Sequence, residues 1–130
     1  MELEELKKKF LVDEGTLKAN LEPILSKVLK HCVCDKKGQV HILGRGLSGR
    51  NQTMMILAAR AIASQLDEKI SARVSIEDLT AYTGLPRNQV RARCKELLDS
   101  RFAVSPERGS YQAVFHRIEA FLDSLSLESS

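Results

Sequence analysis

The sequence predicts an α+β fold that is mostly helical, and two observations on its C-terminal half support this. Two stretches with apolar residues at helical spacing lie on either side of a Gly- and Pro-containing turn. Two short β-prone stretches follow, separated by a second turn with Pro and Gly. The expected helix, tight turn, second helix and two strands are residues 76–82, 83–86, 87–98, 102–104 and 111–115.

The first of these helices has clear start and stop signals. Ser75 stands at the N-cap position, and Asp78 follows three residues later, where a capping box places its acid. Gly84 can adopt the left-handed backbone that ends a helix, and Pro86 suits the first turn of the next one. We therefore expect a tight connection between the two helices.

The second helix divides into an apolar face and a basic face. The apolar residues at helical spacing are Val90, Cys94, Leu97 and Leu98. The other side and its flanks carry Arg87, Asn88, Arg91, Ala92 and Lys95. Residues 86–95 hold four basic residues and no acid. Arginine binds phosphate and guanine well because its planar fork bonds in pairs, so this face suits nucleic acid.

Residues 74–104, VSIEDLTAYTGLPRNQVRARCKELLDSRFAV, resemble the winged helix-turn-helix domains of bacterial and archaeal transcription regulators. The matching positions are Leu79, Gly84, Leu85, Val90, Cys94 and Leu97. Thr80 stands where the motif prefers alanine, and Arg93 stands where an uncharged residue is usual, so Arg93 is a candidate for an internal ion pair. The resemblance covers roughly the last two-thirds of the chain. It implies a winged helix, with residues 102–115 as the wing.

We therefore expect a sequence-specific double-stranded DNA-binding protein, a homodimeric transcription regulator. The expected major-groove residues are Arg87, Asn88, Arg91 and Lys95, with Gln89 at the edge. Arg108 on the wing and Arg101 are expected to contact phosphate or the minor groove. The alternative is a protein-interaction module, because winged helices also serve as adaptors and a fold does not fix a function. RNA binding is disfavoured because few aromatic residues are present to stack on unpaired bases.

The N-terminal part is predicted to form an extension, residues 1–47, ahead of a winged domain over residues 48–127. Expected helices cover residues 2–10 and 16–30, and Pro23 either kinks the second or marks its true start. A hairpin with strands 32–34 and 39–43 follows, turning through Asp35–Gly38. Further helices are expected at 51–69, capped by Ser48 or Asn51, and at 116–125, with disorder from Ser126 onward.

Two local patterns invite a sharper interpretation, and we reject both. His31, Cys32, Cys34 and His41 are potential zinc ligands, but their spacing fits no established zinc signature, so the cysteines are expected in the core. Residues 44–49 match G-x-G-x-x-G by letter, but no βαβ unit follows. We interpret this stretch as a hinge, in which Arg45 and Arg50 are secondary candidates for DNA backbone contacts. No metal, cofactor or small-molecule ligand is inferred.

Composition narrows the class of protein further. No stretch approaches the ~20 apolar residues of a membrane span, the N-terminus is charged, and three cysteines fit free thiols in a reducing compartment, so we expect a cytoplasmic protein. The nucleophile elbow, the His-Glu-x-x-His pattern and the P-loop are all absent from the sequence, which argues against an enzyme.

Overall fold

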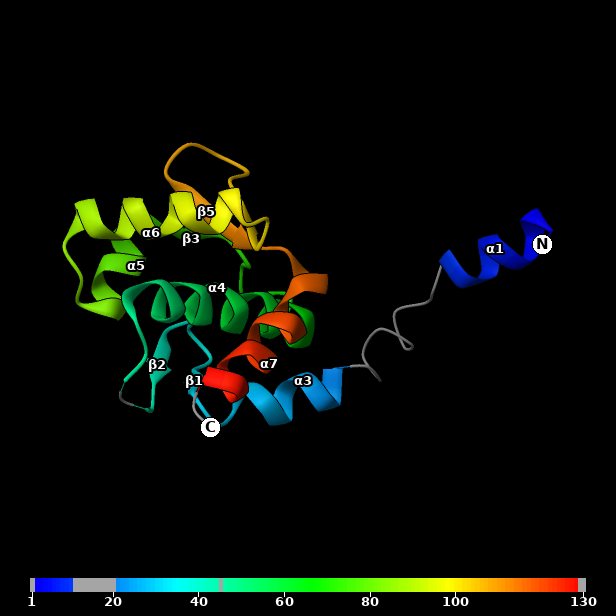
Figure 1. The fold of residues 1–130 in the computed structure, drawn as a ribbon, viewed down its shortest axis with the longest axis horizontal. Helices are drawn as coiled ribbons and strands as arrows, with labels where there is room; N and C mark the ends of the chain where they lie inside the picture. Colours follow the sequence, from blue (N-terminus) through cyan, green and yellow to red (C-terminus); the bar gives the residue numbers. More distant parts are fainter. Residues whose placement is uncertain (1, 11–20, 45, 129–130) are drawn as a thin grey trace.

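The structure, a computed structural model, describes residues 2–10, 21–44 and 46–128, and side chains within 2–6, 21–44 and 46–125 (Figure 1). The helices are α1 (Leu3–Phe10), α3 (Leu21–Val28), α4 (Gly49–Leu66), α5 (Ile76–Thr83), α6 (Arg87–Asp99), the 3-10 turn η1 (Phe115–Arg117) and α7 (Ile118–Glu128). The strands are β1 (Cys32–Cys34), β2 (Val40–Ile42), β3 (Val74–Ser75), β4 (Ala103–Val104) and β5 (Ser110–Ala113). The fold is therefore α+β with two small antiparallel sheets.

Helix α4 is the centre of the hydrophobic core. Ser48 caps its first turn, where the Ser48 Oγ accepts the Asn51 N–H at 3.1 Å. Apolar side chains cover nearly the whole circumference, and those of Met54, Met55, Ile56, Leu57 and Ala58 are all fully buried. Such a helix must be covered on several sides. In Figure 1, α5 and α6 lie on one side of it, with the β1–β2 hairpin and α3 on the other.

The C-terminal half forms a three-stranded sheet with the order β3-β5-β4. Val74 pairs with Tyr111, and Ala103 pairs with Ala113, so β5 lies between the other two strands. The order along the chain is α4, β3, α5, α6, β4, β5. Because β3 precedes α5 directly, the sheet fixes where the pair of helices begins.

The N-terminal part shares the core of the C-terminal half. Ile24, Val28, Cys32 and Val40 belong to the same buried cluster as the α4 side chains. Arg60, the one charged residue in the apolar middle of α4, donates to the carbonyl oxygens of Gly38 at 3.0 Å, Ser71 at 2.8 Å and Arg73 at 3.3 Å. This guanidinium thus ties the turn of the β1–β2 hairpin to the loop before β3.

Several expected boundaries shift in the structure. Helix α3 begins at Leu21, so Pro23 lies in its first turn, where proline is tolerated, and residues 16–20 lie outside the described part of the chain. Helix α4 ends at Leu66 rather than at residue 69, because Asp67 turns to an extended backbone. The disorder expected from Ser126 is wrong as far as Glu128, where α7 ends. None of the helices described has both the length and the apolarity needed to cross a membrane.

Candidate functional site

The turn between α5 and α6 fixes the direction in which α6 leaves the core. Gly84 has a φ of 73°, a left-handed conformation that favours glycine, and its N–H donates to the Thr80 carbonyl at 2.9 Å. The Thr83 hydroxyl donates to the Leu79 carbonyl and accepts the Leu85 N–H. These local bonds end α5 and fix the tight connection between the two helices.

One face of α6 anchors it to the protein. Val90, Cys94 and Leu97 are completely buried, and Leu98 is half-buried. Their spacing of three and four residues places them on one side of a helix that turns 100° per residue. The packing of these side chains against α4 and α5 leaves the opposite side of α6 in solvent.

The solvent side of α6 carries the residues predicted to bind DNA. Asn88, Ala92 and Lys95 form the outermost row by helical geometry, and Arg91 flanks it on one side. All the expected residues of this helix are exposed, namely Arg87, Asn88, Gln89, Arg91 and Lys95. Arg91 and Lys95 form no ion pair with any residue whose side chain is described. Ala92 keeps the middle of the row low, so a flat partner could approach closely.

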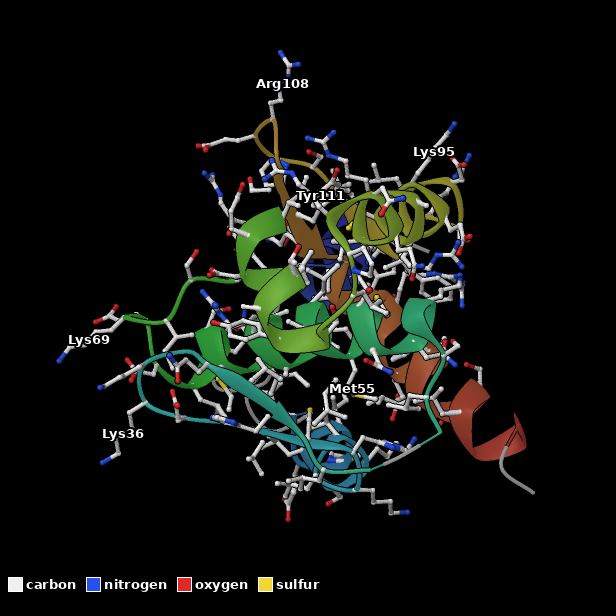
Figure 2. All side chains as sticks on the ribbon, turned by 90° about the vertical axis from the view of Figure 1, so that its left-hand side faces the viewer. Lys36, Met55, Lys69, Lys95, Arg108 and Tyr111 are labelled. Carbon is white, nitrogen blue, oxygen red and sulfur yellow. The ribbon has the colours of Figure 1, made fainter. Side chains whose placement is uncertain are left out.

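The β4–β5 hairpin adds a second basic element on the same side of the molecule. Its turn is held by the Ser105 hydroxyl, which lies 2.9 Å from the carbonyl oxygens of Glu107 and Ser110. Gly109, with a φ of 82°, allows the chain to reverse. Figure 2 shows Arg108 extending from the tip of this turn, beyond α6 and Lys95, whereas Lys36 and Lys69 lie near the β1–β2 hairpin and the end of α4.

A groove of about 690 Å³ separates the first half of α6 from the hairpin. Its cationic lining residues are Arg87, Arg91 and Arg108, and its acidic ones are Glu77 and Glu107. A segment of polyanionic backbone that enters this groove would meet three guanidinium groups from two elements.

The acids beside the basic face are what the sequence analysis missed. Glu77 of α5 pairs with Arg87 at 3.0 Å, and Glu107 pairs with Arg73 at 2.6 Å. A backbone N–H, and then the Arg87 guanidinium, hold the pKa of Glu77 below its usual range. Glu77 is explained in the sequence by its place at a helix start, and only the packing of α5 against α6 brings it to Arg87.

Arg93 and Arg101 have distinct environments. Arg93 is half-buried and pairs with Glu96 at 3.3 Å, which agrees with the internal role expected for it. Arg101 is exposed at the end of α6 with a φ of 64°, and it is the one described non-glycine residue with a positive φ. The N–H groups of Phe102 and Arg101 donate to the carbonyl oxygens of Leu97 and Leu98, which is a Schellman motif with arginine at the position that favours glycine.

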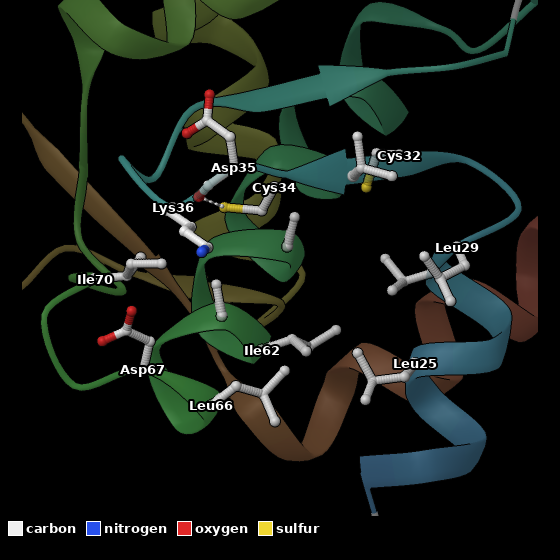
Figure 3. Close-up of a pocket in the computed structure, with 14 residues that line it drawn as sticks. Leu25, Leu29, Cys32, Cys34, Asp35, Lys36, Ile62, Leu66, Asp67 and Ile70 are labelled. Carbon is white, nitrogen blue, oxygen red and sulfur yellow. Dashed lines mark hydrogen bonds between the residues drawn. The ribbon is translucent and has the colours of Figure 1, made fainter.

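A second candidate site is an apolar groove between α3, β1 and the end of α4, of about 360 Å³ (Figure 3). Leu29, Val33 and Leu66 line it and remain 57%, 40% and 58% exposed. Ile62 lines it from α4, and Leu25 lines it from α3. Exposed aliphatic side chains gathered around a hollow indicate a binding surface more than scattered ones do.

The cysteines and the described part of the glycine-rich stretch differ in what surrounds them. Burial raises the pKa of the Cys32 thiol to about 12, as expected for a core residue, and Cys34 is half-buried. Within the described ranges, no group of three or more potential metal ligands comes together. Arg45 lies outside the described residues, and the Arg50 guanidinium lies 5.6 Å from the centre of the Phe102 ring.

The chain was also compared with known proteins, and no protein-family model, no curated protein and no solved structure matched it.

Proposed function

We propose that this chain is a winged helix-turn-helix protein that binds double-stranded DNA and regulates transcription. The succession α4, β3, α5, α6, β4, β5 and the sheet order β3-β5-β4 support the winged-helix assignment. In this proposal α6 is the recognition helix and lies in the major groove, and the β4–β5 hairpin is the wing and lies on the DNA backbone.

The observation that carries the proposal is the position of the cations. Arg87 and Arg91 of α6 and Arg108 of the β4–β5 hairpin line one groove. Lys95, further along α6, lies on the same side of the protein as Arg108 (Figure 2). Basic side chains clustered on one face of a helix and its neighbouring hairpin are the electrostatic pattern of a nucleic-acid binder. The amide side chains of Asn88 and Gln89 add donors and acceptors suited to base edges.

The ion pairs on this face reduce its field but leave it able to bind phosphate. Arg87 and Glu77 are 55% and 64% exposed, and ion pairs this exposed contribute little to stability. A DNA phosphate can therefore take the place of Glu77 beside Arg87 at small cost. Arg91, Lys95 and Arg108 form no ion pair with the described residues and need no such exchange.

The direct test is fluorescence anisotropy of a labelled random-sequence duplex over a series of salt concentrations. The wild type should bind in the micromolar range, with a log–log salt slope of about −0.9 for each phosphate contact. The double variant Arg87→Ala/Arg91→Ala should flatten the slope by about 2. The matched control, Lys37→Ala/Lys69→Ala, removes the same charge from exposed positions outside α6 and the β4–β5 hairpin. It should leave the salt slope unchanged.

DNA binding is refuted if the wild type does not bind the duplex even at low salt. It is also refuted if the two double variants lose the same amount of affinity for the duplex. Equal losses would show that net charge alone, and not the face of α6, attracts the duplex. If the proposal stands and an operator is selected, Arg91→Ala should cost about 1–3 kcal/mol and relax specificity at one position if Arg91 contacts a base. A loss equal on all sequences would make Arg91 a phosphate contact.

We further propose that the protein acts as a homodimer through the apolar groove. The apolar face of α7 is used within the subunit, because Ile118, Phe121, Leu122 and Leu125 are all buried. The groove instead leaves Leu29 and Leu66 exposed. Sedimentation velocity should show a dimer for the wild type and a monomer for Leu66→Glu, whose exposed position tolerates a charge in the folded subunit.

The same groove favours one alternative function, that of a protein-interaction module in a larger assembly. A chain that remains monomeric at all concentrations and binds no duplex would support this alternative. In that case the exposed leucines would contact a different protein, and the basic face of α6 would contact solvent or an acidic surface.

A further inference from the structure

A second pocket lies at the other end of α6, where the chain passes into the edge strand β4. It has a volume of about 490 Å³ and is separate from the groove beside Arg87 and Arg91. Its polar lining residues are Ser100, Arg101, His116 and Arg117, and its other lining residues are apolar. Two arginines and a histidine thus line one hollow, and none of its lining residues is acidic.

Arg117 has an unused donor in this region. Its guanidinium lies 4.5 Å from the centre of the Phe102 ring, which holds the side chain in place by a cation–π contact. Its Nε is buried and has no hydrogen-bond partner among the described residues. A buried N–H without an acceptor is costly, so this side chain would gain from a ligand that drew the guanidinium toward the pocket and supplied an acceptor.

No described carboxylate pairs with either arginine of this pocket. Asp99 is exposed at the end of α6 and does not line the pocket. Glu96 pairs with Arg93, on a different side of the helix. Neither Arg101 nor Arg117 forms an ion pair within the part of the chain that the structure describes.

The backbone at Arg101 points to the same conclusion. A left-handed conformation is unfavourable for a non-glycine residue, and the Schellman turn needs no side chain at this position. The strained residue carries an exposed cation to the rim of the pocket. Strained backbone is typical of positions where the side chain has a task beyond folding.

We propose that this pocket, the Arg101–Arg117 pocket, binds a phosphate group. The planar forks of two arginines suit the oxygens of a phosphate, and the His116 ring can add a hydrogen bond. The Ser100 hydroxyl already donates to the Glu96 carbonyl at 2.8 Å and is not needed for binding. The phosphate belongs either to the DNA backbone, as an extension of the proposed interface past the end of α6, or to a free phosphorylated molecule. The pocket is a site in its own right and does not depend on DNA binding by α6.

The test is a titration of ¹⁵N-labelled full-length protein with inorganic phosphate, followed by NMR. Chloride is exchanged for phosphate at constant pH and ionic strength, so that only a specific site responds. We expect saturable shifts of the amide signals around the pocket, including those of Ser100, Arg101, Phe102 and Arg117. Shifts that remain linear, or that are spread over all exposed basic residues, would overturn the proposal.

Two variants separate binding from folding. Arg117→Gln removes a cation that also packs on Phe102, so its folding is at risk. Arg101→Gly removes a cation and relieves the left-handed strain, so it should fold at least as well as the wild type. Each should weaken phosphate binding about tenfold or more, whereas Lys69→Ala should have no effect. Saturable shifts of undiminished affinity in a folded Arg101→Gly would contradict the assignment of this residue to the site.

A second experiment, with duplex DNA, identifies the source of the phosphate. If the DNA backbone supplies it, Arg101→Gly should flatten the salt slope of duplex binding by about 0.9, and inorganic phosphate should compete with the duplex. If a free molecule supplies it, the salt slope should stay as in the wild type while the NMR shifts still saturate. Because the NMR titration contains no DNA, its result is independent of whether α6 binds a duplex.

Discussion

Replacing Arg101 by glycine should make the protein more stable, although the side chain lost is a large one. The residue is exposed, and its φ of 64° occupies the left-handed position of the Schellman turn that ends α6. Relief of this conformation is worth about 1–2 kcal/mol. Glycine also raises the conformational entropy of the unfolded chain, which lowers the free energy of unfolding by about 0.4–1 kcal/mol. The net gain in the free energy of unfolding should be about 0.5–1 kcal/mol.

The assay is urea unfolding followed by circular dichroism, with Arg101→Ala as the matched control. Alanine removes the guanidinium but keeps a Cβ at a positive φ, so it should remain near or below the wild type. A gain of this size in a chain of 130 residues corresponds to a rise in Tm of about 2–5 °C. If Arg101→Gly is no more stable than Arg101→Ala, the left-handed conformation at residue 101 is not strained, and the phosphate pocket loses one of its supports.

Three further predictions concern the core, the β1–β2 hairpin and the thiols. Leu97→Ala, at a fully buried anchor of α6, should lower the free energy of unfolding by about 2–5 kcal/mol in urea. The Gln39 backbone N–H, first among several partners, holds the pKa of the Asp35 carboxyl below its usual range. The stabilisation that the ionised Asp35 carboxylate provides is complete above the unfolded pKa of about 3.9 and is lost as the pH falls through the folded pKa. The urea midpoints of the wild type and of Asp35→Asn should therefore differ at pH 6 and converge toward pH 2.5. At pH 8, a thiol reagent should label half-buried Cys34 first and should label Cys32 and Cys94 only on unfolding. The reason is that burial raises the pKa of the Cys32 and Cys94 thiols to about 12. Equal labelling rates for all three cysteines would contradict this packing.

Local signals in the sequence predicted the α5–α6 region well, because its start and stop residues act on their immediate neighbours. Ser75 accepts the Asp78 N–H at 3.1 Å, and Gly84 takes the left-handed conformation expected of it. The β1–β2 hairpin also forms around Asp35, whose Oδ1 accepts the N–H groups of Lys37 and Gln39. Interactions between residues so close in the chain depend little on the rest of the fold, so they can be predicted before the fold is known.

Boundaries and partners set by distant contacts could not be predicted in this way. The division at residues 47 and 48 remains a prediction, although Val40 and Met54 on its two sides share one core cluster. The role of Arg60 depends on three carbonyl oxygens from two separate loops. A charged residue inside an apolar helix indicates only that some partner is needed, and packing decides which.

Helical periodicity and local capping in the sequence are enough to specify α5 and α6, the anchoring face of α6 and the exposed row that ends at Lys95. Which of the charges remain available depends on packing in three dimensions. The tertiary structure brings Glu77 to Arg87 across two helices, and it places Arg101 and Arg117 around one pocket. The physical reason is that an ion pair or a pocket depends on distances through space, and those distances exist only once the shared core has fixed the elements against α4.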